Sequence, residues 1–171
     1  MKKLSIEEVK KLHPKTLLKM LNKMKHFLKK NTIVIDMFKE YKISLTELDL
    51  IPMKFGDLEV SARTDHGIIT FNYKLLCDGN FFKDYMYAVH EMTHYLQQTT
   101  GDKPTQGADD GEYLDNPFEQ EGFQRQIEYV GDMFGDNEAD NYVEHLLDHH
   151  KVDDKDDRED KKEKLMELVD E

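Results

Sequence analysis

The stretch His90-Glu91-Met92-Thr93-His94 decides how this chain is interpreted. On a helix, His90 and His94 lie one turn apart and about 40° apart around the axis. Both imidazoles therefore project from the same side and can bind one ion. Glu91 is rotated by roughly 100° from His90, which places its carboxylate beside that ion, where it could hold and deprotonate a water molecule. The spacing therefore predicts a metal centre with a base next to it.

Apolar residues around this motif recur at helical spacing and predict a core-anchored helix over residues 81–98. They are Phe82, Tyr85, Met86, Val89, Thr93 and Leu96. The two histidines lie at the border of this stripe, and the alternative is a helix with two surface histidines. Two neutral nitrogen ligands suit zinc, and three protein ligands with one open position suit a catalytic zinc site. We therefore expect one Zn²⁺ ion.

A third ligand must come from outside this helix. Asn116-Pro117 predicts an N-cap followed by proline at the first helical position, and the helix that begins there offers Glu119 and Glu121. Glu119 shares a helical face with Phe123 and other inward-facing residues, whereas Glu121 points toward the more polar side. We predict Glu119 as the third ligand. The alternatives are Glu121, or a Glu119 that only complements the helix dipole.

The rest of the chain predicts helices on either side of a β-hairpin. Ser5-Ile6-Glu7-Glu8 matches a capping box for a short helix that ends before Pro14. Strands are expected over residues 58–63 and 68–73, joined by the turn residues Asp65-His66-Gly67. Residues 102–115 are expected to form a polar loop. Further helices are predicted from about residue 15 to 30, over 32–41 and over 138–149.

Composition and charge limit the class of protein. Cys77 is the only cysteine, which excludes an intramolecular disulfide and gives no sign of an oxidising compartment. No apolar run approaches the roughly 18 residues of a membrane span, and no secretory segment follows the basic N-terminus. We expect a cytoplasmic protein with no membrane partner. The net charge of −12 is interpreted as solvated helix faces, and no nucleic-acid partner is expected.

Residues 90–98, together with Tyr113 to Glu121, resemble the small zincin-like metallopeptidases of the gluzincin type, including phage and bacterial proteins. The resemblance covers about residues 55–145. In such families two histidines and a downstream glutamate bind zinc, and the glutamate inside the first motif is the general base. The resemblance therefore implies His90, His94 and Glu119 as zinc ligands and Glu91 as the catalytic residue. It also implies hydrolysis of a peptide or protein substrate.

The resemblance implies an α+β, zincin-like fold with helices around a small, mostly antiparallel sheet. We expect a single domain over residues 1–150, with a basic helical part at 1–50 and a catalytic core at 53–150. Residues 151–171 are expected to be a charged tail, helical or disordered. The alternative function is a non-enzymatic binding protein that keeps this scaffold and acts through its charged termini.

Two parts of the expected site have no assigned residue. Many relatives place Asp or Asn four residues after the glutamate ligand to orient a histidine, but this chain has Phe123 there. The partner of that histidine must then come from elsewhere. A group that stabilises the oxyanion is also expected, and the candidates are Tyr113, Tyr129, Tyr142 and His145.

Overall fold

The His90 to His94 motif lies in the middle of helix α5 (Tyr85–Thr99). A tighter 3₁₀ turn, η2 (Phe81–Asp84), precedes it, so the helix predicted over residues 81–98 is confirmed apart from its first turn. His90 and His94 are 4% and 1% exposed. The alternative of a helix with two surface histidines is therefore wrong.

The computed structural model describes residues 2–100 and 113–170. The chain divides into two compact units, Met1–Lys103 and Pro104–Glu171. Most of the predicted polar loop, residues 102–112, lies outside the described residues. The prediction of one domain over residues 1–150 stays a prediction.

The first unit contains a three-stranded sheet in the order β1-β3-β2. The predicted hairpin is confirmed, because β2 (Ala62–Asp65) runs antiparallel to β3 (Ile68–Asn72). The turn between them holds His66 at φ 52° and Gly67 at φ 75°, which is the pair of positive values that a tight hairpin turn needs. Strand β2 begins later than the strand predicted over residues 58–63, and it ends at Asp65, which was predicted to belong to the turn.

The prediction of a mostly antiparallel sheet is wrong. Strand β1 (Met53–Gly56), which the sequence pattern did not indicate, pairs with β3 in parallel. The segment between β1 and β2 crosses to the far side of β3, and the side chain of Asn72 fixes it by donating to the carbonyls of Leu58 and Val60 at 2.9 and 3.0 Å. These residues therefore serve as a connection and not as the start of a strand.

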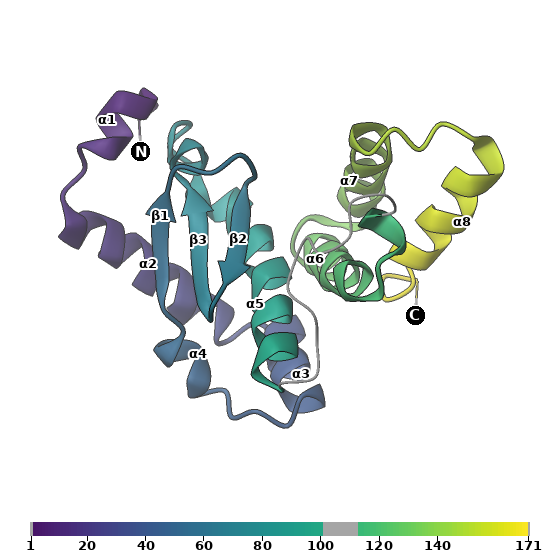
Figure 1. Ribbon diagram of the computed structural model, residues 1–171, viewed down its shortest axis with the longest axis horizontal. Coiled ribbons are helices and arrows are strands. Elements are labelled where there is room, and N and C mark those ends of the chain that lie inside the picture. The colour runs from purple at the N-terminus through teal and green to yellow at the C-terminus, as the bar shows by residue number, and fades with distance from the viewer. Residues whose placement is uncertain (1, 101–112, 171) are drawn as a thin grey trace. The chain divides into compact units, whose positions relative to one another are not determined.

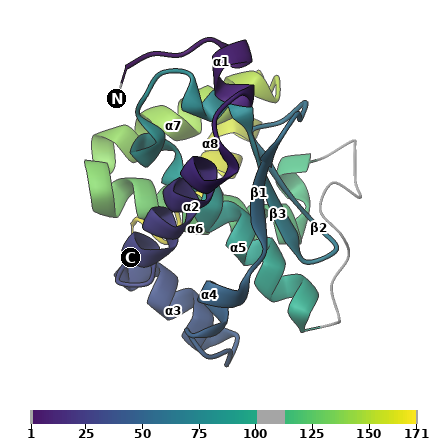
Figure 2. The same ribbon diagram turned by 90° about the vertical axis from the view of Figure 1, so that its left-hand side faces the viewer.

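Helices cover one face of this sheet. Figures 1 and 2 show α2 (Pro14–Leu28) and α5 on the same face, and both contact strands. Phe55, Phe71 and Ala62 are buried on that face, whereas Lys54, Arg63 and Asp65 are exposed. The remaining helices of the first unit are α1 (Ile6–Lys10), α3 (Thr32–Glu40) and α4 (Glu47–Leu50), followed after β3 by the turn η1 (Tyr73–Leu76).

An aromatic cluster fixes the beginning of α5 against the sheet. The Phe81 ring lies 5.4 Å from that of Phe55, 5.9 Å from Phe71 and 5.5 Å from Tyr85, measured between centroids. Edge-to-face and tilted contacts at these distances add to the burial of apolar area. The motif helix is thus anchored one and a half turns before His90.

The second unit is helical. It contains the turn η3 (Tyr113–Asp115), α6 (Pro117–Phe134), α7 (Asp136–His149) and α8 (Lys155–Leu165). Asn116 caps α6, as predicted, because its Oδ1 accepts from the backbone N–H groups of Phe118 at 2.9 Å and Glu119 at 3.4 Å. Gly135, at φ 100°, makes the turn from α6 to α7.

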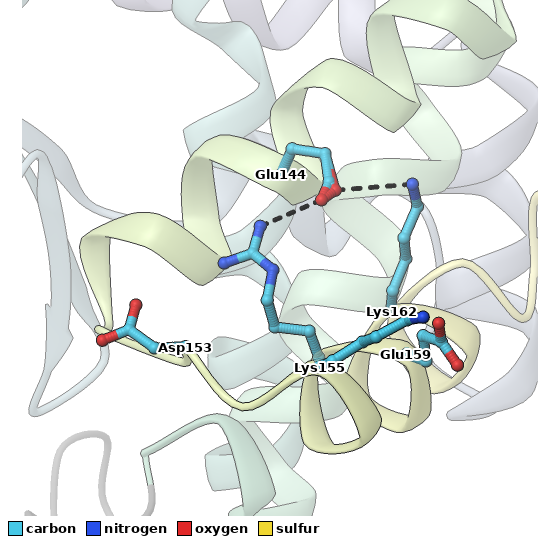
Figure 3. Close-up of a pocket in the computed structure, with 6 residues that line it drawn as sticks. Glu144, Asp153, Lys155, Glu159 and Lys162 are labelled. Atoms are coloured by element: carbon cyan, nitrogen blue, oxygen red, sulfur yellow. Dashed lines mark hydrogen bonds and ion pairs between the residues drawn. The ribbon is translucent and has the colours of Figure 1, made fainter.

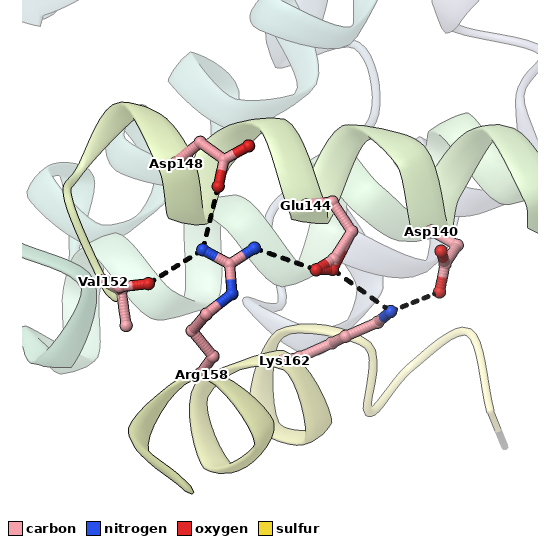
Figure 4. Close-up of polar contacts among 6 residues, drawn as sticks. All are labelled: Asp140, Glu144, Asp148, Val152, Arg158 and Lys162. Atoms are coloured by element: carbon pink, nitrogen blue, oxygen red, sulfur yellow. Dashed lines mark hydrogen bonds and ion pairs between the residues drawn. The ribbon is translucent and has the colours of Figure 1, made fainter. Parts of the chain in front are cut away.

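Ion pairs hold α8 against α7, as Figure 4 shows. Arg158 donates to Asp148 and to Glu144, each at 2.9 Å, and to the carbonyl of Val152 at 2.8 Å. Lys162 lies 2.6 Å from Asp140. The expected charged tail therefore contains a helix, and much of its charge is matched within the second unit. None of the helices in the described ranges has the length and hydropathy needed to cross a membrane.

The cap on α6 yields a stability prediction. Asn116→Ala removes the acceptor for two N–H groups at the start of the helix, which costs about 1 kcal/mol and lowers Tm by roughly 2–4 °C. Asn137→Ala, at an exposed position in the first turn of α7, is the control. Thermal unfolding followed by circular dichroism measures both, and equal Tm values for the two variants would contradict the assigned cap.

Candidate metal centre

Helix α5 brings His90 and His94 together with their Nε2 atoms facing each other. These two nitrogens lie 3.1 Å apart, and the ring centroids lie 4.9 Å apart. Two lone pairs at this distance in a buried site repel each other unless a proton or a cation lies between them. The pair is therefore suited to share one positive centre.

Gln97 determines which nitrogen of His94 faces that centre. Its Oε1 lies 2.8 Å from Nδ1 of His94. An amide oxygen only accepts hydrogen bonds, so Nδ1 carries the hydrogen, and the Nε2 of a neutral His94 presents a lone pair. Sequence analysis did not identify Gln97, although its position three residues after His94 on the same helix face was a usable signal.

Glu91 is held by the sheet. Oγ1 of Thr64, on β2, lies 2.8 Å from Oε1 of Glu91 and 3.0 Å from its backbone oxygen. The backbone oxygen belongs to the helix ladder, so the carboxylate is the better acceptor for the single hydroxyl hydrogen. Both side chains are buried. A hydrogen bond from a neighbouring strand thus fixes the position of the predicted base.

Glu119 lies in the first turn of α6, in the second unit. It is 1% exposed, whereas Glu121 is half-buried. His90 and His94 in the first unit and Glu119 in the second are each buried, and each offers one atom that can bind a metal ion. The identity of the metal and the role of Glu91 stay predictions.

His150 interacts electrostatically with Glu119 within the second unit, and it was not among the predicted site residues. Its ring stacks on Tyr113 at 5.1 Å and meets the edge of Phe123 at 6.4 Å. Burial lowers the pKa of His150, neighbouring His149 lowers it further, and the charge of Glu119 opposes both. Phe123 therefore contacts the ring of His150, which is not one of the predicted metal ligands.

The four predicted oxyanion candidates lie in different environments. Tyr129 is fully buried in the core. The hydroxyl of Tyr142 accepts from Nε2 of Gln126 at 2.7 Å. His145 is exposed on α7. Tyr113 stacks on His150 and is half-buried. No one of them is singled out by these contacts.

The start of α5 carries a buried acid. Burial raises the pKa of Asp84 to about 6, and the ammonium of Lys83, 3.2 Å away, opposes this increase. Burial also raises the pKa of Tyr87, one turn further along the helix. The first turn of the motif helix is thus a poorly hydrated environment in which ionised groups are disfavoured.

A cavity of about 340 Å³ lies between α7 and α8, neither of which carries a predicted metal ligand (Figure 3). Three acids and three bases line it. Glu144 is already paired with Arg158 and Lys162, so the charges of the wall compensate one another. The cavity therefore favours neither an anion nor a cation.

Comparisons with known proteins return no match, whether with family models, with curated proteins or with solved structures. A functional assignment therefore depends on the site itself.

The hydrogen bond from Thr64 to Glu91 is testable by an isosteric change. Thr64→Val leaves a buried carboxylate without its hydroxyl donor, which costs about 1–3 kcal/mol, or roughly 2–4 °C in Tm for each kcal/mol. Thr70→Val, on the opposite face of the sheet, is the matched control. If chemical denaturation finds the two variants equally stable, the assigned bond is wrong.

Proposed function

We propose that this protein is a zinc-dependent metallopeptidase whose metal ligands are His90, His94 and Glu119 and whose general base is Glu91. The observation that supports this most strongly is the pair of buried imidazoles with facing Nε2 atoms. Such a pair is costly in a protein interior unless a hydrogen or a cation lies between the two nitrogens, and a zinc ion meets that requirement. The resemblance of the sequence to gluzincin-type peptidases supports the peptidase assignment.

The donor set fits zinc. Tetrahedral coordination at 2.0–2.1 Å places two nitrogen ligands about 3.3 Å apart, close to the 3.1 Å between the Nε2 atoms of His90 and His94. Glu119 adds one carboxylate to two neutral imidazoles, which is a ligand combination of catalytic zinc sites. When bound, zinc would lower the pKa of a water molecule and polarise a carbonyl group.

Glu91 performs the proton transfers in this proposal. Its carboxylate takes the proton of the attacking water and then delivers it to the leaving amine nitrogen. The hydroxyl of Thr64 lies 2.8 Å from Oε1 of Glu91 and so orients the carboxylate. Because the carboxylate is buried, it reacts in a site of low polarity in which its orientation is already fixed.

The substrate is an extended peptide segment. Strand β2 is an outer strand of the sheet and carries Thr64, so a peptide that pairs with its edge would lie near Glu91. Strand addition binds backbone groups and leaves alternate side chains to set specificity. This arrangement favours unfolded or flexible segments over folded domains as substrates.

Metal analysis tests the ligand set. We expect one zinc per chain in the purified protein and loss of that zinc in His90→Ala and Glu119→Ala. Glu121→Ala is the matched control and keeps the metal, because its side chain lies on the more exposed side of α6. Inductively coupled plasma mass spectrometry measures the stoichiometry. Loss of zinc in Glu121→Ala alone would assign the third ligand to Glu121.

Hydrolysis of a broad peptide library tests the catalytic role. Glu91→Gln keeps the shape of the side chain but cannot accept a proton, so it should keep the zinc and lose about 10²–10⁴-fold in rate. Full activity in that variant would exclude Glu91 as the base, and full activity after chelation would exclude the mechanism. A wild type with stoichiometric zinc and no turnover would favour the non-enzymatic binding protein.

A further inference from the structure

We infer that Gln97 is the positioning residue of the metal ligand His94: it fixes both the tautomer and the orientation of that imidazole. The inference rests on the proposed zinc site. Many relatives orient a histidine ligand with Asp or Asn at the position that Phe123 occupies in this chain. The inference assigns that role to Gln97, which lies on the same helix as His94.

Both contacts of the His94 ring that bear on this inference are made by residues of α5. Oε1 of Gln97 lies 2.8 Å from Nδ1 of His94, while Nε2 of the same ring lies 3.1 Å from Nε2 of His90. The two nitrogens of His94 therefore have separate tasks. Nδ1 donates to the amide, and Nε2 faces the position where the ion would bind.

Burial distinguishes this contact from an ordinary helix-surface pair. An exposed pair three residues apart on a helix contributes only about 0.2–0.5 kcal/mol. Gln97 and His94 are each 1% exposed, so water cannot replace the amide as the partner of Nδ1. Loss of the amide oxygen would leave a buried N–H without an acceptor and allow the ring to flip or change tautomer.

The residue at the position where many relatives have Asp or Asn cannot take this role. Phe123 has no acceptor, and its ring packs edge-on against Tyr113 at 5.8 Å. A neutral amide also differs from a carboxylate in its effect, because it orients the imidazole without adding negative charge to the site. We expect a ligand that is well oriented but less basic than one paired with a carboxylate.

Zinc affinity of the full-length chain tests the inference. Gln97→Met keeps the length of the side chain and removes the strong acceptor, and Gln97→Glu restores an acceptor. Gln98→Met, at the next position on α5, is the matched control. Competition between each protein and a chelator for Zn²⁺ gives the dissociation constants. We expect Gln97→Met to bind zinc about 10–100-fold more weakly, and Gln97→Glu and Gln98→Met to bind at least as tightly as wild type.

A second readout does not require the metal. In the zinc-free protein at a pH where His94 is neutral, ¹⁵N–¹H correlation spectra should show its hydrogen on Nδ1 in wild type and a mixture of tautomers in Gln97→Met. A wild-type His94 with its hydrogen on Nε2 would overturn the inference.

The two experiments separate failure of this inference from failure of the proposed function. If the wild-type protein binds no zinc, the proposed function is wrong. The tautomer of His94 in the zinc-free protein would still test whether Gln97 positions that ring. A wild type that binds zinc, with an unchanged dissociation constant in Gln97→Met, would overturn the positioning role alone. If Gln97→Met does not fold, a tenfold loss of affinity in Gln97→Glu contradicts the inference.

Discussion

The structure depends on one constraint, which is that two buried imidazole nitrogens face each other at 3.1 Å. Such a pair needs a hydrogen or a cation between the two nitrogens, and it needs a rigid support. The support is helix α5, whose start is fixed by the rings around Phe81. Thr64 and Gln97 then hold the neighbouring carboxylate and the outer nitrogen of His94. The contacts of α5 with its surroundings therefore converge on this pair.

Local rules were sufficient where one segment determines the structure. The helical spacing of His90 and His94 and the cap at Asn116 follow from neighbours a few residues away, and both are confirmed. The hairpin turn at Gly67 is confirmed for the same reason. The mixture of helices with a small sheet was also predictable, because the apolar period changes from helical to alternating along the chain.

Contacts between distant segments could not be predicted in this way. Strand β1 is only four residues long and gains its partner from β3, so its sequence carries no independent signal. Thr64 lies outside the strand predicted over residues 58–63, and its contact with Glu91 had no signal in the sequence. The third ligand could not be predicted fully for the same reason. Helical phase places Glu119 and Glu121 on different faces of the helix, but it does not predict which residues either one contacts. The ion pairs between α7 and α8 show the same limit, because these charged residues were interpreted only as solvated helix faces.

The central claim is that His90 and His94 bind the same zinc ion. Zinc K-edge X-ray absorption of the purified chain tests it most directly, because outer-shell scattering from imidazole rings counts the histidine ligands. If both histidines bind the ion, the spectrum contains only nitrogen and oxygen neighbours at about 2.0–2.1 Å, with scattering from two imidazoles. A spectrum with one imidazole or none, or a chain that binds no zinc, would contradict it.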